Sequence, residues 1–111
     1  MIKIRCICIN DKNRPNEISI DKWIKFGEMY HITWIYNQMQ QKGIKGVILA
    51  EKDISNCIPF NCFNLKRFAI LQDDLDKFIE LCKQSKEFND IEVNELINEI
   101  LTKENIEINE I

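Results

Sequence analysis

The residues best suited to chemistry in this chain are its five cysteines and its one histidine. Two cysteine pairs are close in sequence, Cys6-x-Cys8 and Cys57-x4-Cys62, and His31 lies in the segment between them. Such a set could bind zinc, but the spacing lacks the repeated C-x2-C pairs of a zinc knuckle. The alternative is that the thiols are small buried hydrophobic groups in a reducing compartment. Their odd number prevents complete pairing within one chain. The sequence favours buried thiols and predicts no metal site.

Catalytic motifs give no clearer signal. A thiol hydrolase could use a cysteine beside His31, but no glycine-rich turn that could bind an oxyanion accompanies any cysteine. Phosphate-binding, dinucleotide-binding and zinc-protease motifs are absent. Asp73, Asp74 and Asp76 resemble the start of a calcium loop, but its glycine and later ligands are missing, so a helix start is favoured. We therefore predict no catalytic residue and no cofactor, and a binding protein rather than an enzyme.

Charge divides the 111-residue chain into two unlike parts. Residues 1–71 carry 11 basic and 6 acidic side chains, a net charge of +5, whereas residues 72–111 carry 4 basic and 12 acidic ones, a net charge of −8. The overall charge of −3 conceals this asymmetry. An uneven charge distribution of this kind indicates interaction with a charged partner.

The basic part intersperses cations with aromatic residues, as small barrels that bind single-stranded nucleic acid do. Its cations are dispersed, and the acidic part would repel phosphate, so RNA or DNA binding is the alternative hypothesis. In our first hypothesis these residues contact a protein, because aromatic and arginine side chains dominate interface energies. The candidate contacts in this part are Arg14, Trp23, Lys25, Tyr36 and Arg67.

The acidic part has two interpretations as well. Its carboxylates line the polar faces of two expected helices, where the simplest interpretation is a solvated surface. Alternatively, they dock on a basic groove of a protein that normally holds nucleic acid, and complementary potentials speed the encounter. Glu92, Glu95 and Glu99 are the candidate contacts for that interaction.

Alternation of apolar and polar residues predicts an antiparallel sheet in the first part. We expect strands at 1–10, 29–37, 44–51 and 66–71, with a hairpin between the second and third. A polar loop at 11–17, a polar connection at 38–42 closed by Gly43, and an irregular segment at 53–65 separate them. Gly27 should provide a positive φ in a tight turn. In the second strand, alternation places Tyr30, Ile32, Trp34 and Tyr36 on one face.

The periodicity changes from two to 3.6 residues at Gln72, which predicts two amphipathic helices. Asp73 or Asp74 should cap the first helix, whose apolar stripe is Leu75, Phe78, Ile79 and Cys82. Asp90 should cap the second, whose stripe is Val93, Leu96, Ile97, Ile100 and Leu101. The tail around 106–108 is either frayed helix or a short added strand. The expected organisation is a β domain at 1–71 followed by an acidic helical segment at 72–111, within one compact domain.

The segment Trp23-Ile-Lys25-Phe-Gly27-Glu-Met-Tyr30 leads from a turn into a strand and resembles SH3-like small barrels. Those barrels commonly have a lysine-glycine turn before a strand that opens with an aromatic residue. The resemblance implies an SH3-like β-sheet or barrel in residues 1–71, although the acidic-aromatic cluster that grips proline-rich peptides is missing. The overall character is also similar to small accessory proteins of phages and prophages.

These observations predict an α+β protein that acts as a non-enzymatic protein-interaction module. The sharper hypothesis is a phage-type inhibitor, of the anti-CRISPR kind, that binds a host nucleic-acid-processing enzyme or ribonucleoprotein such as a CRISPR effector. The first residues lack the apolar core of a signal peptide, and no apolar run is long enough to span a membrane. We therefore expect a cytoplasmic monomer or dimer that does not bind a membrane.

Overall fold

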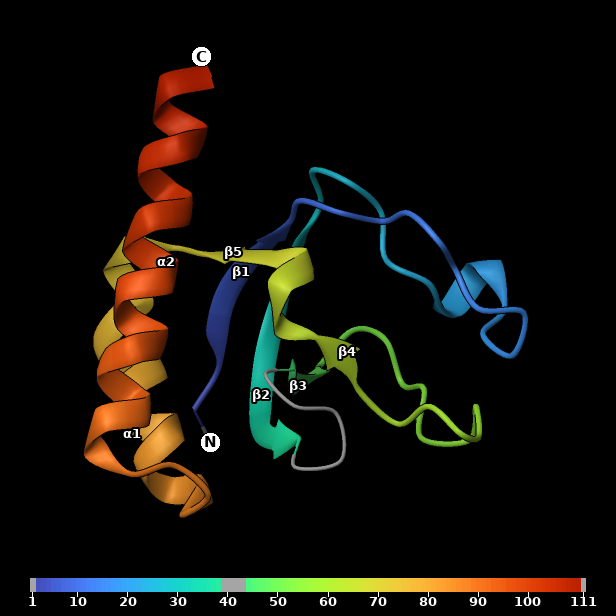
Figure 1. Cartoon of the computed structure of the whole chain (residues 1–111). Helices are drawn as coiled ribbons and strands as arrows, with labels where there is room; N and C mark the ends of the chain where they lie inside the picture. The colour runs from blue at the N-terminus through green and yellow to red at the C-terminus, as the bar shows by residue number, and fades with distance from the viewer. Residues whose placement is uncertain (1, 39–43, 111) are drawn as a thin grey trace.

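A computed structural model describes the backbone of residues 2–38 and 44–110, and the side chains of residues 2–37 and 45–100. The described elements are β1 (Ile4–Cys8), β2 (Met29–Gln38), β3 (Ile44–Leu49), β4 (Phe63–Asn64), β5 (Phe68–Ile70), α1 (Leu75–Ser85) and α2 (Asp90–Glu110). Short 3-10 helices occur at Ile20–Lys22, Leu65–Arg67 and Gln72–Asp74. The predicted fold class is confirmed: a five-stranded antiparallel sheet precedes two C-terminal helices (Figure 1).

The strands follow the order β4-β3-β2-β1-β5 across one sheet. The expected hairpin between β2 and β3 is present, whereas β4 lies in a segment that was expected to be irregular. β4 and β5 are consecutive in the chain but form opposite edges, joined through the 3-10 helix Leu65–Arg67. The sheet is therefore not closed into a barrel.

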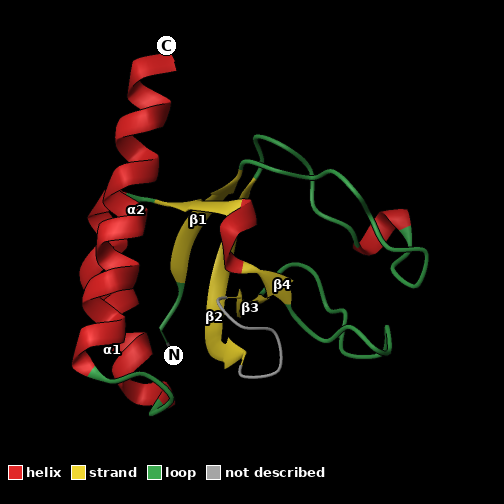
Figure 2. Cartoon of the chain, viewed as in Figure 1, coloured by secondary structure: helices red, strands yellow, loops and turns green. Residues whose placement is uncertain are grey.

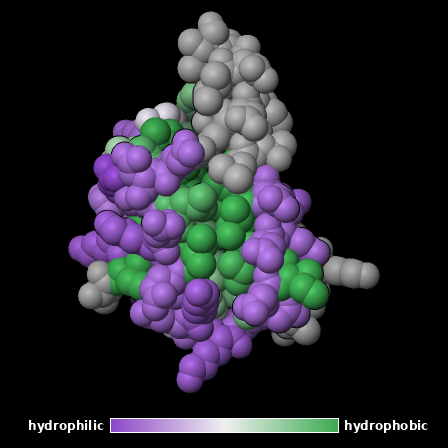
Figure 3. Space-filling view, turned by 90° about the vertical axis from the view of Figure 1, so that its left-hand side faces the viewer, coloured by the Kyte–Doolittle hydropathy of each residue, from purple (hydrophilic) through white to green (hydrophobic). Residues whose placement is uncertain are grey.

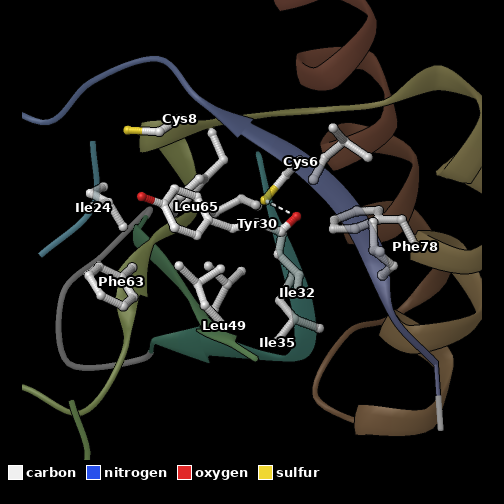
Figure 4. Packing of buried hydrophobic residues seen from close by; sticks show 14 of the residues in the cluster. Cys6, Cys8, Ile24, Tyr30, Ile32, Ile35, Leu49, Phe63, Leu65 and Phe78 are labelled. Carbon is white, nitrogen blue, oxygen red and sulfur yellow. Dashed lines mark hydrogen bonds between the residues drawn. The ribbon is translucent and has the colours of Figure 1, made fainter. Parts of the chain in front are cut away.

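One hydrophobic core joins the sheet, the loops and the helices. Buried residues from neighbouring strands face each other across the ladder, for example Cys6 opposite Tyr30 and Cys8 opposite Phe68. Phe78 of α1 completes the core from the helical side (Figure 4). The helices lie side by side along one side of the sheet, and two long loops extend from the other (Figures 1 and 2).

A β-bulge in β2 overturns the predicted distribution of its aromatic side chains. The register with β3 shifts between Ile32 and Trp34, so that Ile32 and Ile35 are both completely buried. Trp34 and Tyr36 are only half-buried, although strict alternation placed them beside Ile32. A bulge places two residues against one on the partner strand, and this breaks the period of two.

Both predicted helices form, but their caps differ from the expected ones. The side chain of Asp74 makes no capping hydrogen bond to α1. At α2 the cap is Asn89 rather than Asp90, because the Asn89 Oδ1 accepts the Glu92 backbone N–H at 2.8 Å. The Glu92 carboxylate accepts the Asn89 N–H at 3.1 Å in return, which forms a reciprocal capping box. Gly27 has φ +83°, as the turn required.

Some of the predictions from sequence concern residues that the structure does not describe. The connection predicted at 38–42 and closed by Gly43 lies mostly within 39–43, and the side chain of Leu101 also lies outside the described residues. The helical backbone continues to Glu110. The tail at 106–108 is therefore helical in its backbone.

Candidate interaction surface

Several charged residues of the β module, meaning the strands and loops of residues 2–38 and 44–70, bond within the fold. Arg5 forms a two-point ion pair with Asp74: its Nη2 lies 2.8 Å from Oδ1 and its Nε lies 3.0 Å from Oδ2. The Arg5 backbone N–H also donates to Asp74, at 2.8 Å. The Arg5 guanidinium, through its hydrogen bonds, lowers the pKa of the buried Asp74 to about 2. This pair fixes the start of the helical segment to β1.

Arg67 and Trp23, two predicted partner contacts, are brought together by the fold. The Arg67 guanidinium carbon lies 5.0 Å from the Trp23 ring centroid, within the range of a cation–π contact. The same guanidinium donates to the backbone oxygens of Lys12 at 2.8 Å and Asn10 at 3.2 Å. Trp23 is only 7% exposed, and its indole N–H donates to the Asp11 carbonyl at 2.7 Å. Both side chains hold the 9–28 loop against the sheet.

The other predicted contacts of the β module are scattered. Arg14 is exposed, but its guanidinium donates to the Ile18 carbonyl. Lys25 is exposed in the turn before β2, and its backbone N–H donates to the Tyr30 hydroxyl at 2.9 Å. Tyr36 is half-buried near the end of β2, opposite Gly46. Whether these residues contact a partner remains a prediction.

α2 carries the three predicted acidic contacts on one side. Glu92, Glu95 and Glu99 are spaced i, i+3 and i+7, so a helical rise of about 1.5 Å per residue distributes their carboxylates over about 10 Å. Glu92 also accepts from the Asn37 side chain at 2.8 Å. The backbone N–H of Asn89, and then this amide, lower the pKa of Glu92. Among the described residues, Glu95 and Glu99 have no hydrogen-bond or ion-pair partner.

These carboxylates form one wall of a groove that we call the α2 groove. It has a volume of about 140 Å³ and lies between α2 and the β module. Lys45 and Lys66 lie on the wall across from the carboxylates, and the floor consists of the buried side chains of Leu65, Phe68, Leu96 and Ile100. The sequence indicated the acidic wall, because its spacing is helical. It could not indicate the two lysines or the floor, because only the tertiary fold places them beside α2.

A second apolar feature lies between the two helices, and we call it the helix seam. Leu75 and Ile79 of α1 and Ile97 of α2 pack against the core but are only partly buried. On this side of the molecule, hydrophobic side chains form a strip between two hydrophilic flanks (Figure 3). Periodicity identified all three residues but could not show that they stay partly uncovered.

Most of the thiols are buried, and the histidine lies beside a carboxylate. Burial raises the pKa of Cys6 and of Cys82 to about 12 and also raises that of Cys8, so all three remain neutral thiols. His31 lies against Glu51, which also accepts the His31 backbone N–H at 2.8 Å. Within the described part of the chain, no three His, Cys, Asp or Glu residues are placed to share a metal ion.

Comparison of the chain with protein-family models, with curated proteins and with solved structures finds no significant match. Within the residues described, neither helix combines the length and the apolarity that a membrane span requires.

Proposed function

We propose that this chain is a non-enzymatic protein-interaction module whose binding face is the helical side of the molecule. The helix seam is the observation that carries this proposal, because partly exposed apolar side chains rimmed by hydrophilic ones are typical of an interaction site (Figure 3). Its hydrophilic flanks match the common pattern of an apolar interface centre with a polar rim.

The distribution of charge supports a protein rather than a nucleic acid as the partner. The three arginines of the sequence all bond within the fold, to Asp74, to the Ile18 carbonyl, and to Asn10 and Lys12. Trp23 and Tyr30, two aromatic residues that could stack on bases, are buried. Residues 90–100 of α2 carry four carboxylates and no basic side chain, which would repel phosphate.

The finer proposal names the class of partner. A row of carboxylates along α2 complements a basic groove, and basic grooves are typical of enzymes that hold nucleic acid. An inhibitor of such an enzyme, including a CRISPR effector, would cover that groove with α2. Polyanions such as heparin would then compete with this protein for the partner.

Capture from a nuclease-treated lysate of the source cell tests the proposal. The immobilised chain is compared with Ile79→Glu, which places a charge in the helix seam. The control is Ile20→Glu, because Ile20 is 74% exposed in the 9–28 loop, away from the helices. Circular dichroism establishes that all three proteins fold. We expect a protein that the wild type and Ile20→Glu retain, that Ile79→Glu loses, and that heparin displaces.

Binding to bare nucleic acid is the competing outcome. Fluorescence anisotropy with a labelled single-stranded RNA and a salt titration measures it directly. A steep salt dependence together with equal binding by Ile79→Glu would overturn the proposal in favour of an RNA-binding regulator. Equal capture of the same proteins by Ile79→Glu and the wild type would also overturn it.

A further inference from the structure

The α2 groove lies on the side of α2 that faces the β module, and its chemistry defines a ligand more narrowly than the helix seam does. We propose that it binds a segment of a partner protein that carries one large apolar side chain flanked by lysine or arginine. This inference rests on the proposed function and identifies the peptide chemistry that the module recognises.

The floor of the groove determines the apolar part of the ligand. Leu65, Phe68, Leu96 and Ile100 are each at most 5% exposed, so the floor is a fixed part of the core. The volume of about 140 Å³ is close to that of an apolar cavity of ~150 Å³ that holds benzene. The space is therefore about the size of one phenylalanine or leucine side chain.

The acidic wall determines the charge of the ligand. Glu95 and Glu99 are exposed and have no partner among the described residues, so a cation can approach them without breaking a bond to any of those residues. Glu92 is held by Asn89 and Asn37 and contributes a fixed negative charge next to them. Lysine or arginine beside the apolar side chain would meet these carboxylates at the rim, where charges increase the association rate.

Lys45 and Lys66 restrict the ligand further. They line the groove from the β module and are not ion-paired to any described residue, although the charge of Lys45 helps to lower the pKa of Glu92. A purely cationic segment would meet repulsion at this wall, and a nucleic acid would meet repulsion at the other. A peptide can interact favourably with both sides of the groove. Its backbone carbonyls or one acidic side chain can face the lysines while its cations face the carboxylates of α2. This asymmetry favours a protein segment of fixed orientation.

Synthetic peptides that carry either lysine or glutamate beside a phenylalanine test this inference. The probe is a 12-residue capped peptide with a central phenylalanine and three lysines on one side. Its matched forms replace the phenylalanine with serine, or the lysines with glutamate. Heteronuclear NMR of the 15N-labelled full chain detects binding even at millimolar Kd. We expect shift changes at Leu65, Phe68 and Leu96 with the lysine–phenylalanine peptide, and at least about fivefold weaker binding for the serine form.

The second part of the experiment reverses charges on the protein and measures binding of the same peptides. Glu95→Lys/Glu99→Lys should bind the lysine peptide about tenfold more weakly and the glutamate peptide more tightly. Asp76→Lys/Glu80→Lys is the control, because it changes the net charge equally on exposed residues of α1. Equal weakening by both variants, or shift changes confined to other residues, would overturn the inference. Failure of every peptide while the seam-dependent capture persists would overturn this inference and leave the proposed function standing.

Discussion

The arginines of the β module differ from Glu95 and Glu99 of α2 in how they are bonded. In the β module, Arg5, Arg14 and Arg67 all bond to groups of the same chain, and Lys52 donates to the Asp21 carbonyl at 2.9 Å. In α2, Glu95 and Glu99 have no partner among the described residues. In residues 1–71 the three arginines are therefore occupied within the fold, whereas Lys45 and Lys66 are not ion-paired to any described residue. Glu95 and Glu99 could therefore meet a partner without losing a bond to any described residue.

The Arg5–Asp74 pair should give the largest effect of any charged residue on stability. Asp74→Ala leaves the Arg5 guanidinium and backbone N–H without their acceptor, and because the Arg5 side chain is 41% exposed and water can reach it, we expect a cost of about 2 kcal/mol. Urea denaturation measures the free energy of unfolding. The control Asp73→Ala removes an exposed neighbouring carboxylate and should change it by less than about 0.5 kcal/mol. A loss below about 1 kcal/mol for Asp74→Ala would show that this pair does not anchor the helices.

The same pair predicts how stability depends on pH. The pKa of Asp74 is about 2 in the folded chain, compared with 3.8 for an ordinary aspartate. The stabilisation is therefore complete above about pH 4 and is lost as the pH falls from about 4 to 2, by about 2 kcal/mol in total. The free energy of unfolding between pH 5 and pH 2 measures it. Asp74→Asn has no carboxyl group to titrate at this position, so its free energy of unfolding should fall by about 2 kcal/mol less over this pH range. If the free energy of unfolding fell equally with pH in both proteins, Asp74 would not be the group responsible.

Arg67 should have an intermediate effect, because it joins the 9–28 loop to the sheet. Arg67→Ala removes the cation–π contact with Trp23 and the hydrogen bonds to Asn10 and Lys12, which should cost about 1.5 kcal/mol. Arg67→Lys should recover only part of this, since an ammonium lacks the planar fork of donors. Urea unfolding measures the stability, with the exposed Lys66→Ala as control. If Arg67→Ala unfolded like Lys66→Ala, Arg67 would be free for a partner after all.

The comparison also shows which features a sequence can reveal. The β2–β3 hairpin, the turn at Gly27 and the apolar stripes of both helices follow from local periodicity and local backbone requirements. The bulge after Ile32 is different, because the pairing partner on β3 determines it and no local pattern records it. The two-residue strand β4 was not predicted either, because it forms by pairing with β3 and has no local pattern of its own.

The candidate interaction surface was predictable only on the helical side. The spacing of Glu92, Glu95 and Glu99 predicts a common face of a helix, and they do line one groove. Trp23 looked like an interface anchor because tryptophan is frequent at interfaces, but its burial depends on contacts with Arg67 and Phe63 that are distant in sequence. Asp74 looked like a helix cap because of its position, yet it bonds to a strand 69 residues earlier.

The smallest predicted effect tests whether the α2 carboxylates are dispensable for folding. Glu95 and Glu99 are spaced i, i+4, where like charges destabilise a helix, so Glu95→Gln/Glu99→Gln should raise the free energy of unfolding by about 0.3 kcal/mol. The contrasting control is Glu92→Ala, which removes one half of the capping box with Asn89 and should cost about 1 kcal/mol. Urea denaturation at low salt measures both variants. Opposite signs for neighbouring carboxylates would mean that Glu92 serves the fold while Glu95 and Glu99 reduce its stability slightly. A loss above about 1 kcal/mol for the double variant would show instead that these charges contribute to folding, and the contrast between α2 and the β module would not hold.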